Sequence, residues 1–290
     1  MSANSLPELT TVESLACRIM ELANERVAPK WLQYKFLRTI SQAWVYRTMH
    51  RRMFVDGIDK IVGLNPDRGV VLASNHRTFF DQYVGMLGMY EAGVTWTRKI
   101  FFPVRSNFFY EHPVGVALNL FVAGGVMFPP IFREASKPSI NRQSVDRLVA
   151  YLQEPGTLVG VHPEGTRGKG DDPYELLRAQ PGIGEIILKS KAIVLPLFLN
   201  GLSNDFVGQV RKNYQSGIRN RDPIIACFGD PVDYSDFAGK PPRATLYKRT
   251  ADRVREAIMK LGNRERELRA QCQRGAIPDD APGWLFNCRG

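Results

Sequence analysis

Four short apolar runs, each bounded by polar or turn-forming residues, most constrain the fold of this 290-residue chain. The runs cover residues 69–74, 157–161, 192–199 and 223–228. Their length and apolar character are typical of buried strands. Helical patterns lie between them over residues 81–91 and 183–191. This alternation predicts an α/β fold, a mixed β-sheet flanked by helices. The polar stretch 204–222 is predicted to be a long loop.

The charge of the chain points to an anionic partner. Its 39 Lys and Arg outnumber 29 Asp and Glu, which gives a net charge of +10. Residues 26–52 hold seven basic side chains and no acidic one. Five apolar residues in this stretch fall on one side of a helix: Leu32, Phe36, Leu37, Ile40 and Trp44. An N-terminal basic amphipathic helix is therefore predicted, which either binds an anionic membrane surface or docks on the core with a solvated basic rim. No nucleic-acid-binding signature is present, so we expect no nucleic acid partner.

Other segments set expectations about organisation and location. Residues 113–132 carry no charge and reach membrane-spanning length, but they contain three prolines. Buried core or an apolar groove is the preferred interpretation, and a segment that dips into the membrane is the alternative. Four cysteines without a C-x-x-C spacing argue against zinc and disulfides and for a reducing compartment. We expect a membrane-associating segment over 1–55, an α/β domain over 56–262 and a tail over 263–290.

Two polar clusters follow predicted strands, at the edge where α/β sheets bind ligands. In the first, His76 precedes Asp81 by five residues, so a turn before a helix would let the carboxylate reach the imidazole. Such a histidine takes a proton from a hydroxyl, and no G-x-S-x-G nucleophile accompanies it. In the second cluster, Gly165 allows a close backbone approach and Arg167 offers a planar fork to an anion. A structural histidine and a surface arginine are the alternatives.

Together these clusters resemble the motifs of the glycerophospholipid acyltransferases, the PlsC-like family typified by 1-acylglycerol-3-phosphate acyltransferase. Asn75–Asp81 resembles the NHxxxxD block, and Phe132-Arg133 resembles the second block, which ends in arginine. Residues 163–167, Pro-Glu-Gly-Thr-Arg, resemble the FPEGTR block, with His162 in place of the usual phenylalanine. Residues 194–197 resemble the fourth, proline-centred block. The blocks occur in family order.

The resemblance implies that a fatty acyl thioester, acyl-CoA or acyl-ACP, donates its acyl group to a lysophospholipid hydroxyl in phospholipid biosynthesis. It makes His76 the general base and Asp81 the residue that orients it, with no cofactor and no metal. The acceptor-binding residues that it implies are Arg133, Glu164, Gly165, Thr166, Arg167 and Pro196. It also implies a peripheral or monotopic protein on the cytoplasmic face of a membrane.

The identity of the acceptor stays open at this point. The first alternative is an acyltransferase for a lipid without glycerol phosphate, such as a lyso-aminolipid. The second is a membrane-surface lipid-binding protein without turnover, although the paired His76 and Asp81 argue against it.

Overall fold

The computed structural model describes residues 9–132, 137–237 and 239–289. Its centre is a six-stranded sheet with strand order β1-β8-β7-β2-β6-β3. The strands are β1 Met53–Asp56, β2 Val70–Ser74, β3 Lys99–Phe101, β6 Thr157–Val161, β7 Ile193–Asn200 and β8 Ile224–Phe228. Neighbouring strands run parallel except for the antiparallel pair β7 and β8. A separate small sheet pairs β4 Val104–Arg105 with β5 Pro130–Ile131.

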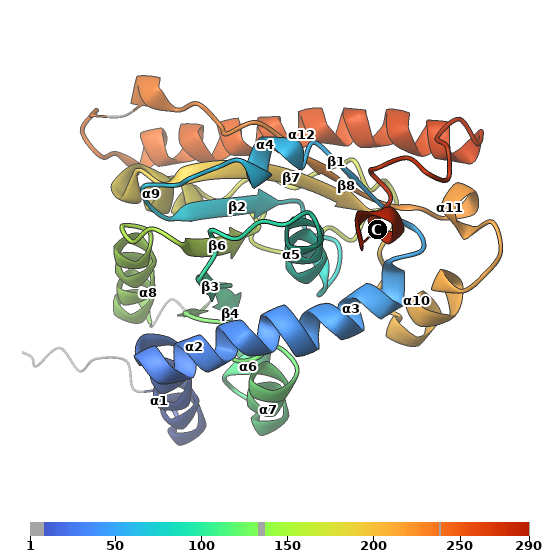
Figure 1. Cartoon of the computed structure of the whole chain (residues 1–290). Helices are drawn as coiled ribbons and strands as arrows, with labels where there is room; N and C mark the ends of the chain where they lie inside the picture. Colours follow the sequence, from blue (N-terminus) through green and yellow to red (C-terminus); the bar gives the residue numbers. More distant parts are fainter. Residues whose placement is uncertain (1–8, 133–136, 238, 290) are drawn as a thin grey trace, which may run out of the picture.

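Helices cover both faces of the large sheet (Figure 1). The longer ones are α1 Thr11–Glu25, α2 Val27–Phe36, α3 Gln42–Met49, α5 Asp81–Glu91, α7 Pro113–Phe121, α8 Pro138–Tyr151, α9 Pro181–Ser190, α10 Phe206–Asn213 and α12 Ala244–Gln273. The four-residue helices are α4 Asp59–Val62, α6 Ser106–Phe109 and α11 Ile218–Arg221. Two 3₁₀ helices span Ser235–Phe237 and Leu285–Arg289. α9 and α12 lie on one face, while α5 lies on the other, above α2 and α3 (Figure 1).

Alternate side chains of β2 enter two cores because a strand points successive residues to opposite faces. Leu72 packs in a cluster with Val84 of α5, and Val71 packs in a second cluster with Ile187 of α9. All five residues of β2 are buried, which explains their unbroken apolar sequence. The α9 helix also approaches α12 closely: a Cβ on Gly184 would lie 1.9 Å from the backbone oxygen of Tyr247.

The predicted mixed α/β fold is confirmed, and the four predicted strands and the two helices predicted between them agree with the structure to within two residues. The predicted loop over 204–222 is wrong, because it contains α10 and α11. The side chain of Asp205 caps α10 by accepting a hydrogen bond from Gly208 N at 2.9 Å. Phe206 then packs edge-on against Trp44 of α3, with ring centroids 5.6 Å apart. This tertiary contact is not visible in the local pattern.

The predicted one-sided apolar face over residues 26–52 is not confirmed. A π-helical stretch, Leu37–Ser41, separates α2 from α3 and shifts the helical register, so a single 3.6-residue period does not hold across it. Leu32 and Ile40 are 63% and 58% exposed, whereas Leu37 is buried. Lys30, expected on a basic rim, is buried as well.

The predicted domain boundaries stay predictions. β1 begins at Met53, before the boundary at residue 55, and α12 continues unbroken through the boundary at residue 262. In the uncharged stretch 113–132, α7 exposes Val114 and Phe121, while Val126 and Phe128 are buried. Among the described residues no helix combines the length and the apolar character that a membrane crossing needs.

Candidate active site

The turn after β2 is fixed to the neighbouring strand by Asn75. Its buried side-chain amide donates to Leu199 O at 2.9 Å and accepts from Leu199 N at 2.8 Å. The amide thus replaces the backbone pairing that β2 no longer provides beyond Ser74. This places the next residue, His76, at the carboxyl edge of the sheet.

His76 and Asp81 are in contact. His76 Nδ1 lies 3.1 Å from Asp81 Oδ2, and Asp81 is the first residue of α5. The same carboxylate accepts hydrogen bonds from Arg77 N, Thr78 N and the Thr78 hydroxyl at 2.8, 2.9 and 2.6 Å. Residues 76–80 therefore turn around the carboxylate, which brings residues five apart together, as the sequence predicted.

The environment keeps Asp81 ionised and His76 accessible. Burial by itself would raise the pKa of Asp81, but the His76 hydrogen bond, the nearby His162 and His76 rings and Thr78 outweigh it, so the pKa is lowered. Asp81 is 2% exposed, whereas the His76 side chain is 20% exposed. With Nδ1 held by the carboxylate, Nε2 is the nitrogen left to exchange a proton with a substrate.

His162 stacks on His76 with ring centroids 3.7 Å apart and planes 8° apart. Its Nδ1 lies 3.2 Å from Ser74 O and 3.0 Å from Asn75 O, a geometry that fits an Nδ1–H donor. Burial first, and then the neighbouring His76, lower the pKa of His162 to about 3, so its ring is neutral at ordinary pH. Sequence reasoning noted His162 but missed this contact. The available signal was its position directly after β6, which pairs with β2.

Glu164 ties the second cluster to the first. Its Oε1 accepts from His76 N at 2.9 Å and its Oε2 accepts from Leu177 N at 2.7 Å. The carboxylate is 3% exposed. Burial raises its pKa, and the hydrogen bonds from Leu177 N and His76 N oppose that rise. With one oxygen on each backbone amide, Glu164 positions the His76 turn, a part that sequence reasoning did not assign to it.

The remaining residues of this cluster face outward. Gly165 has φ of +63°, and a Cβ there would lie 2.9 Å from Gln180 Cγ, so only glycine fits without strain. Thr166 is partly exposed in the turn that follows. The Arg167 guanidinium lies 4.0 Å from the centroid of the Phe79 ring. Phe79 follows His76 by three residues in the sequence. No hydrogen bond from this guanidinium reaches any residue within the described ranges.

Two other predicted site residues remain to be placed, and the structure describes one of them. Pro196 is buried in β7, where it pairs with Ala73, and its ring lies next to Gly229, where an added Cβ would be 2.9 Å from Pro196 Cγ. Arg133 lies outside the described residues. Arg77 Nη2 donates a hydrogen bond to Gly170 O at 2.6 Å, which ties the turn after β2 to the loop after Arg167.

A metal ion does not suit the one cluster of potential ligands found in the described ranges. His76, Asp81 and His162 have ligand atoms within 4.8 Å of one another. The two imidazole rings are nearly parallel and stacked, so their lone pairs lie in separate planes and do not converge on one point. His76 Nδ1 is also already engaged by Asp81. This arrangement suits proton transfer better than metal binding.

A histidine held by a buried carboxylate suits proton transfer from a substrate. Comparison with known families identifies the general activity. The family model described as Acyltransferase matches residues 52–200, about half of the chain. The chain belongs to the Acyltransferase family. The match covers both polar clusters and β7, and it assigns acyl transfer as the general activity. A search of curated proteins finds no match.

Proposed function

We propose that this acyltransferase moves a fatty acyl group from an acyl thioester to the hydroxyl of a lysophospholipid, with 1-acylglycerol-3-phosphate as the first candidate, in phospholipid biosynthesis. One observation carries the proposal: the His76–Asp81 pair and the unpaired Arg167 guanidinium lie on turns that hydrogen-bond to each other through Glu164 and through Gly168 N and His76 O at 2.9 Å. These hydrogen bonds support the proposal that the base for a hydroxyl and the partner for a phosphate act together.

The reaction follows from these groups. His76 Nε2 takes the proton of the acceptor hydroxyl as its oxygen attacks the thioester carbonyl. Asp81, ionised and bound to Nδ1, stabilises the imidazolium that forms. Collapse of the tetrahedral intermediate breaks the carbon–sulfur bond, and the imidazolium returns the proton to the thiolate. The ester oxygen then carries the acyl group, the free thiol leaves, and His76 is neutral again.

Arg167 is proposed to bind the acceptor phosphate. Its planar guanidinium matches phosphate oxygens, and the ring of Phe79 supports one of its faces. We expect Arg167→Ala to lower kcat/KM for lysophosphatidate by about 10- to 150-fold, the scale of a hydrogen bond to a charged group. The kcat/KM for monoacylglycerol, which has no phosphate, should change little. Arg167→Lys should restore only part of the lost kcat/KM, because a lysine ammonium keeps the positive charge but cannot form the paired hydrogen bonds of a planar guanidinium.

The test compares both acceptors in wild type, Arg167→Ala, Arg167→Lys and a control, Arg142→Ala. The control removes the same charge from an exposed position on α8. If wild type prefers monoacylglycerol, or if Arg167→Ala lowers kcat/KM equally for both acceptors, the phosphate assignment is wrong. An acceptor without glycerol phosphate, such as a lyso-aminolipid, is then favoured. If purified protein consumes no thioester with any lysolipid, a non-catalytic lipid-binding protein is the better description.

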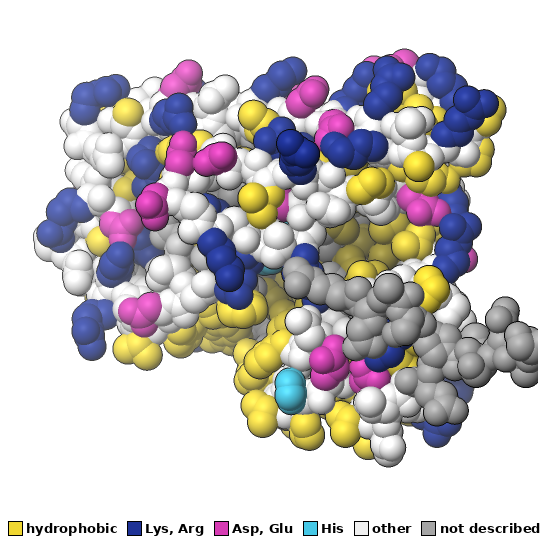
Figure 2. All heavy atoms as spheres, turned by 180° about the vertical axis from the view of Figure 1, so that it is seen from behind, with side chains coloured by type: hydrophobic (Ala, Val, Ile, Leu, Met, Phe, Trp, Pro, Cys, Tyr) yellow, Lys and Arg dark blue, Asp and Glu magenta, His cyan; other side chains and the backbone are white. Residues whose placement is uncertain are grey.

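We also propose that the protein binds the cytoplasmic face of a membrane peripherally, through exposed apolar residues of α2 and α7. Val27, Trp31 and Phe121 are 88%, 60% and 77% exposed, and they belong to α2 and α7. Seen from behind, hydrophobic side chains gather on the lower side of the body and around the lobe below it, where α1, α6 and α7 lie (Figures 1 and 2). Exposed apolar surface of this kind favours the bilayer interface.

Vesicle sedimentation tests the membrane proposal. Trp31→Ser with Phe121→Ser should reduce binding to anionic vesicles, whereas Val207→Ser, at a 65% exposed apolar position on α10, should not. Equal binding by the two variants would contradict the assignment of this surface.

A further inference from the structure

A cavity of about 400 Å³ lies apart from His76 but at the same edge of the sheet. Its lining includes Arg51, Gln215, Arg219, Asn220 and Phe286. The strands β1 and β8 run opposite to β7, so their first residues lie at the edge where β7 and β2 end. Arg51 precedes β1 closely, which places the cavity three strand spacings, or about 14 Å, from the end of β2.

A short helix links this cavity to the turn that carries His76. Asn204, just before α10, accepts a hydrogen bond from Phe79 N at 3.0 Å. At the other end of α10, Tyr214 lies beneath the Arg51 guanidinium, 4.9 Å from its ring centroid. Eight residues of helix span about 12 Å, which agrees with the strand-based estimate.

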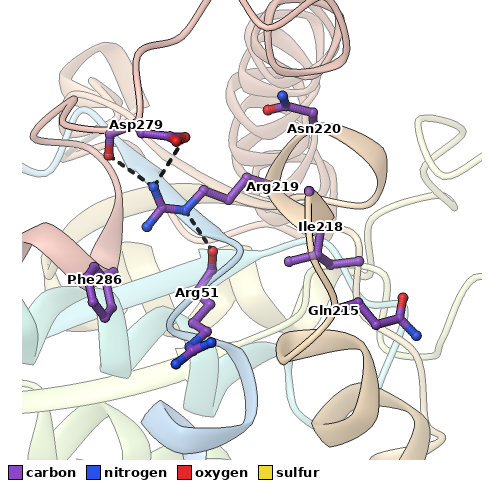
Figure 3. Close-up of a pocket in the computed structure, with 8 residues that line it drawn as sticks. Arg51, Gln215, Ile218, Arg219, Asn220, Asp279 and Phe286 are labelled. Carbon is purple, nitrogen blue, oxygen red and sulfur yellow. Dashed lines mark hydrogen bonds and ion pairs between the residues drawn. The ribbon is translucent and has the colours of Figure 1, made fainter.

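The cavity combines cationic groups with exposed aromatic rings. Figure 3 shows the Arg219 side chain between Asp279 and the backbone of Arg51, with Phe286 to one side. Arg219 Nε donates to Arg51 O at 2.9 Å and its Nη1 to Asp279 O at 3.0 Å. The Arg51 guanidinium lies over the Tyr214 ring. Phe286, in the lining, is 49% exposed and stacks on His50 with ring centroids 5.9 Å apart. Tyr214, which precedes Gln215 of the lining, is 52% exposed.

The charge around the cavity is strongly positive. Residues 47–52 and 206–222 together carry seven Lys or Arg and one acidic residue, Asp222. Asp222 is already paired with Arg52 and Lys212. Asp279 is the acidic side chain in the lining, where it forms an ion pair with Arg219 and offsets part of that charge. Arginines beside exposed aromatic faces suit a ligand with phosphates and a stacking base.

We propose that this cavity binds the phosphorylated adenosine end of coenzyme A, so that the acyl donor spans from here to His76. The inference rests on the proposed function, because it concerns the donor of that reaction. A pantetheine arm is as long as four or five extended residues, roughly 15 Å, which fits the separation along the sheet edge. Arg51 and Arg219 would hold phosphate oxygens, and Phe286 or Tyr214 would stack on the adenine.

The first test measures binding of adenosine 3′,5′-bisphosphate to the full chain by titration calorimetry, without any acyl transfer. We expect saturable binding that Arg51→Ala weakens by about tenfold or more. Asp279→Asn should tighten binding, because it removes the negative charge beside Arg219. Arg142→Ala, which removes a charge on α8, should leave binding unchanged. No binding to wild type, or equal affinity in Arg51→Ala and Arg142→Ala, would overturn the proposal.

The second test separates this site from the acyltransferase activity itself. Arg51→Ala should raise KM for acyl-CoA but leave transfer from acyl-pantetheine, which lacks the nucleotide, unchanged. If Arg51→Ala impairs transfer from both donors equally, or if it leaves transfer from acyl-CoA unchanged, the cavity is not the nucleotide site. The proposed function stands in either case. If a short-chain anionic phospholipid displaces the bisphosphate more effectively than CoA does, the cavity is a lipid headgroup site and the proposal fails.

Discussion

The stacked pair of histidines gives a quantitative prediction for His162→Phe. His162 has an ordinary pKa of 6.5 in the unfolded chain and about 3 in the folded protein. Between these values the unfolded state binds a proton that the folded state does not, so stability falls as pH drops below 6.5. From pH 8 to pH 5 this one group should cost wild type about 2 kcal/mol of unfolding free energy. That figure stays the same for any folded pKa below about 4.

Phenylalanine keeps a flat ring against His76 but does not titrate. The substitution removes the N–H that faces Ser74 O and Asn75 O, which should lower stability by about 1–3 kcal/mol at about pH 8, where His162 is neutral in both the folded and the unfolded chain. The informative quantity is therefore the difference in pH dependence. Urea unfolding at about pH 5 and pH 8 should show that the variant loses about 2 kcal/mol less than wild type.

The control is His112→Ala, which removes an exposed histidine at the N-terminal boundary of α7, and its pH dependence is measured beside that of wild type. Histidine NMR should agree, with the His162 ring signals constant between about pH 5 and pH 8. Parallel loss of stability in wild type and His162→Phe would refute the reasoning, because His162 would then titrate alike in the folded and unfolded chains.

Three other changes probe the site. Asp81→Asn should lower turnover by about 10²-fold or more and lower the melting temperature, because the carboxylate holds both His76 and the turn; activity and thermal unfolding are measured together. Glu164→Gln should lower kcat with little effect on the KM for the donor, because a glutamine amide cannot accept hydrogen bonds from both His76 N and Leu177 N. Steady-state kinetics in which only the KM for the acceptor changed would contradict a positioning role. Gly165→Ala should cost about 1–2 kcal/mol in chemical unfolding because φ is +63° and Gln180 blocks a Cβ.

Strands buried on both faces were predictable because their sequences are continuously apolar. β2, β6 and β8 are fully buried and agree with the runs found in the sequence. β1 and β3 were missed, since these edge strands have only four and three residues and no long apolar run. Residue type and local spacing identify central strands well, but the ends of a sheet depend on contacts far apart in the chain.

The contact between His76 and Asp81 was predictable because the residues are close in sequence and precede a helix. The role of Glu164 was not, since its two partners, His76 N and Leu177 N, are backbone groups 88 and 13 residues away. Sequence motifs name the residues of a site. They do not distinguish a carboxylate that touches a substrate from one that holds the catalytic turn.

The basic stretch 26–52 shows why a count of charges overstates attraction to a membrane. Lys30 is buried, where its amine donates to Asn24, Gln33 and the carbonyl of Ile100, and burial followed by Lys99 holds its pKa well below the usual range.

Arg52 is fully buried beside Asp222, and Arg51 lines the cavity at the sheet edge. Arg26 and Lys35 of the α2 region remain exposed near the apolar surface of that helix. The salt dependence of vesicle binding should therefore reflect a few charges instead of seven, and neutralising Arg26 and Lys35 together should remove most of it.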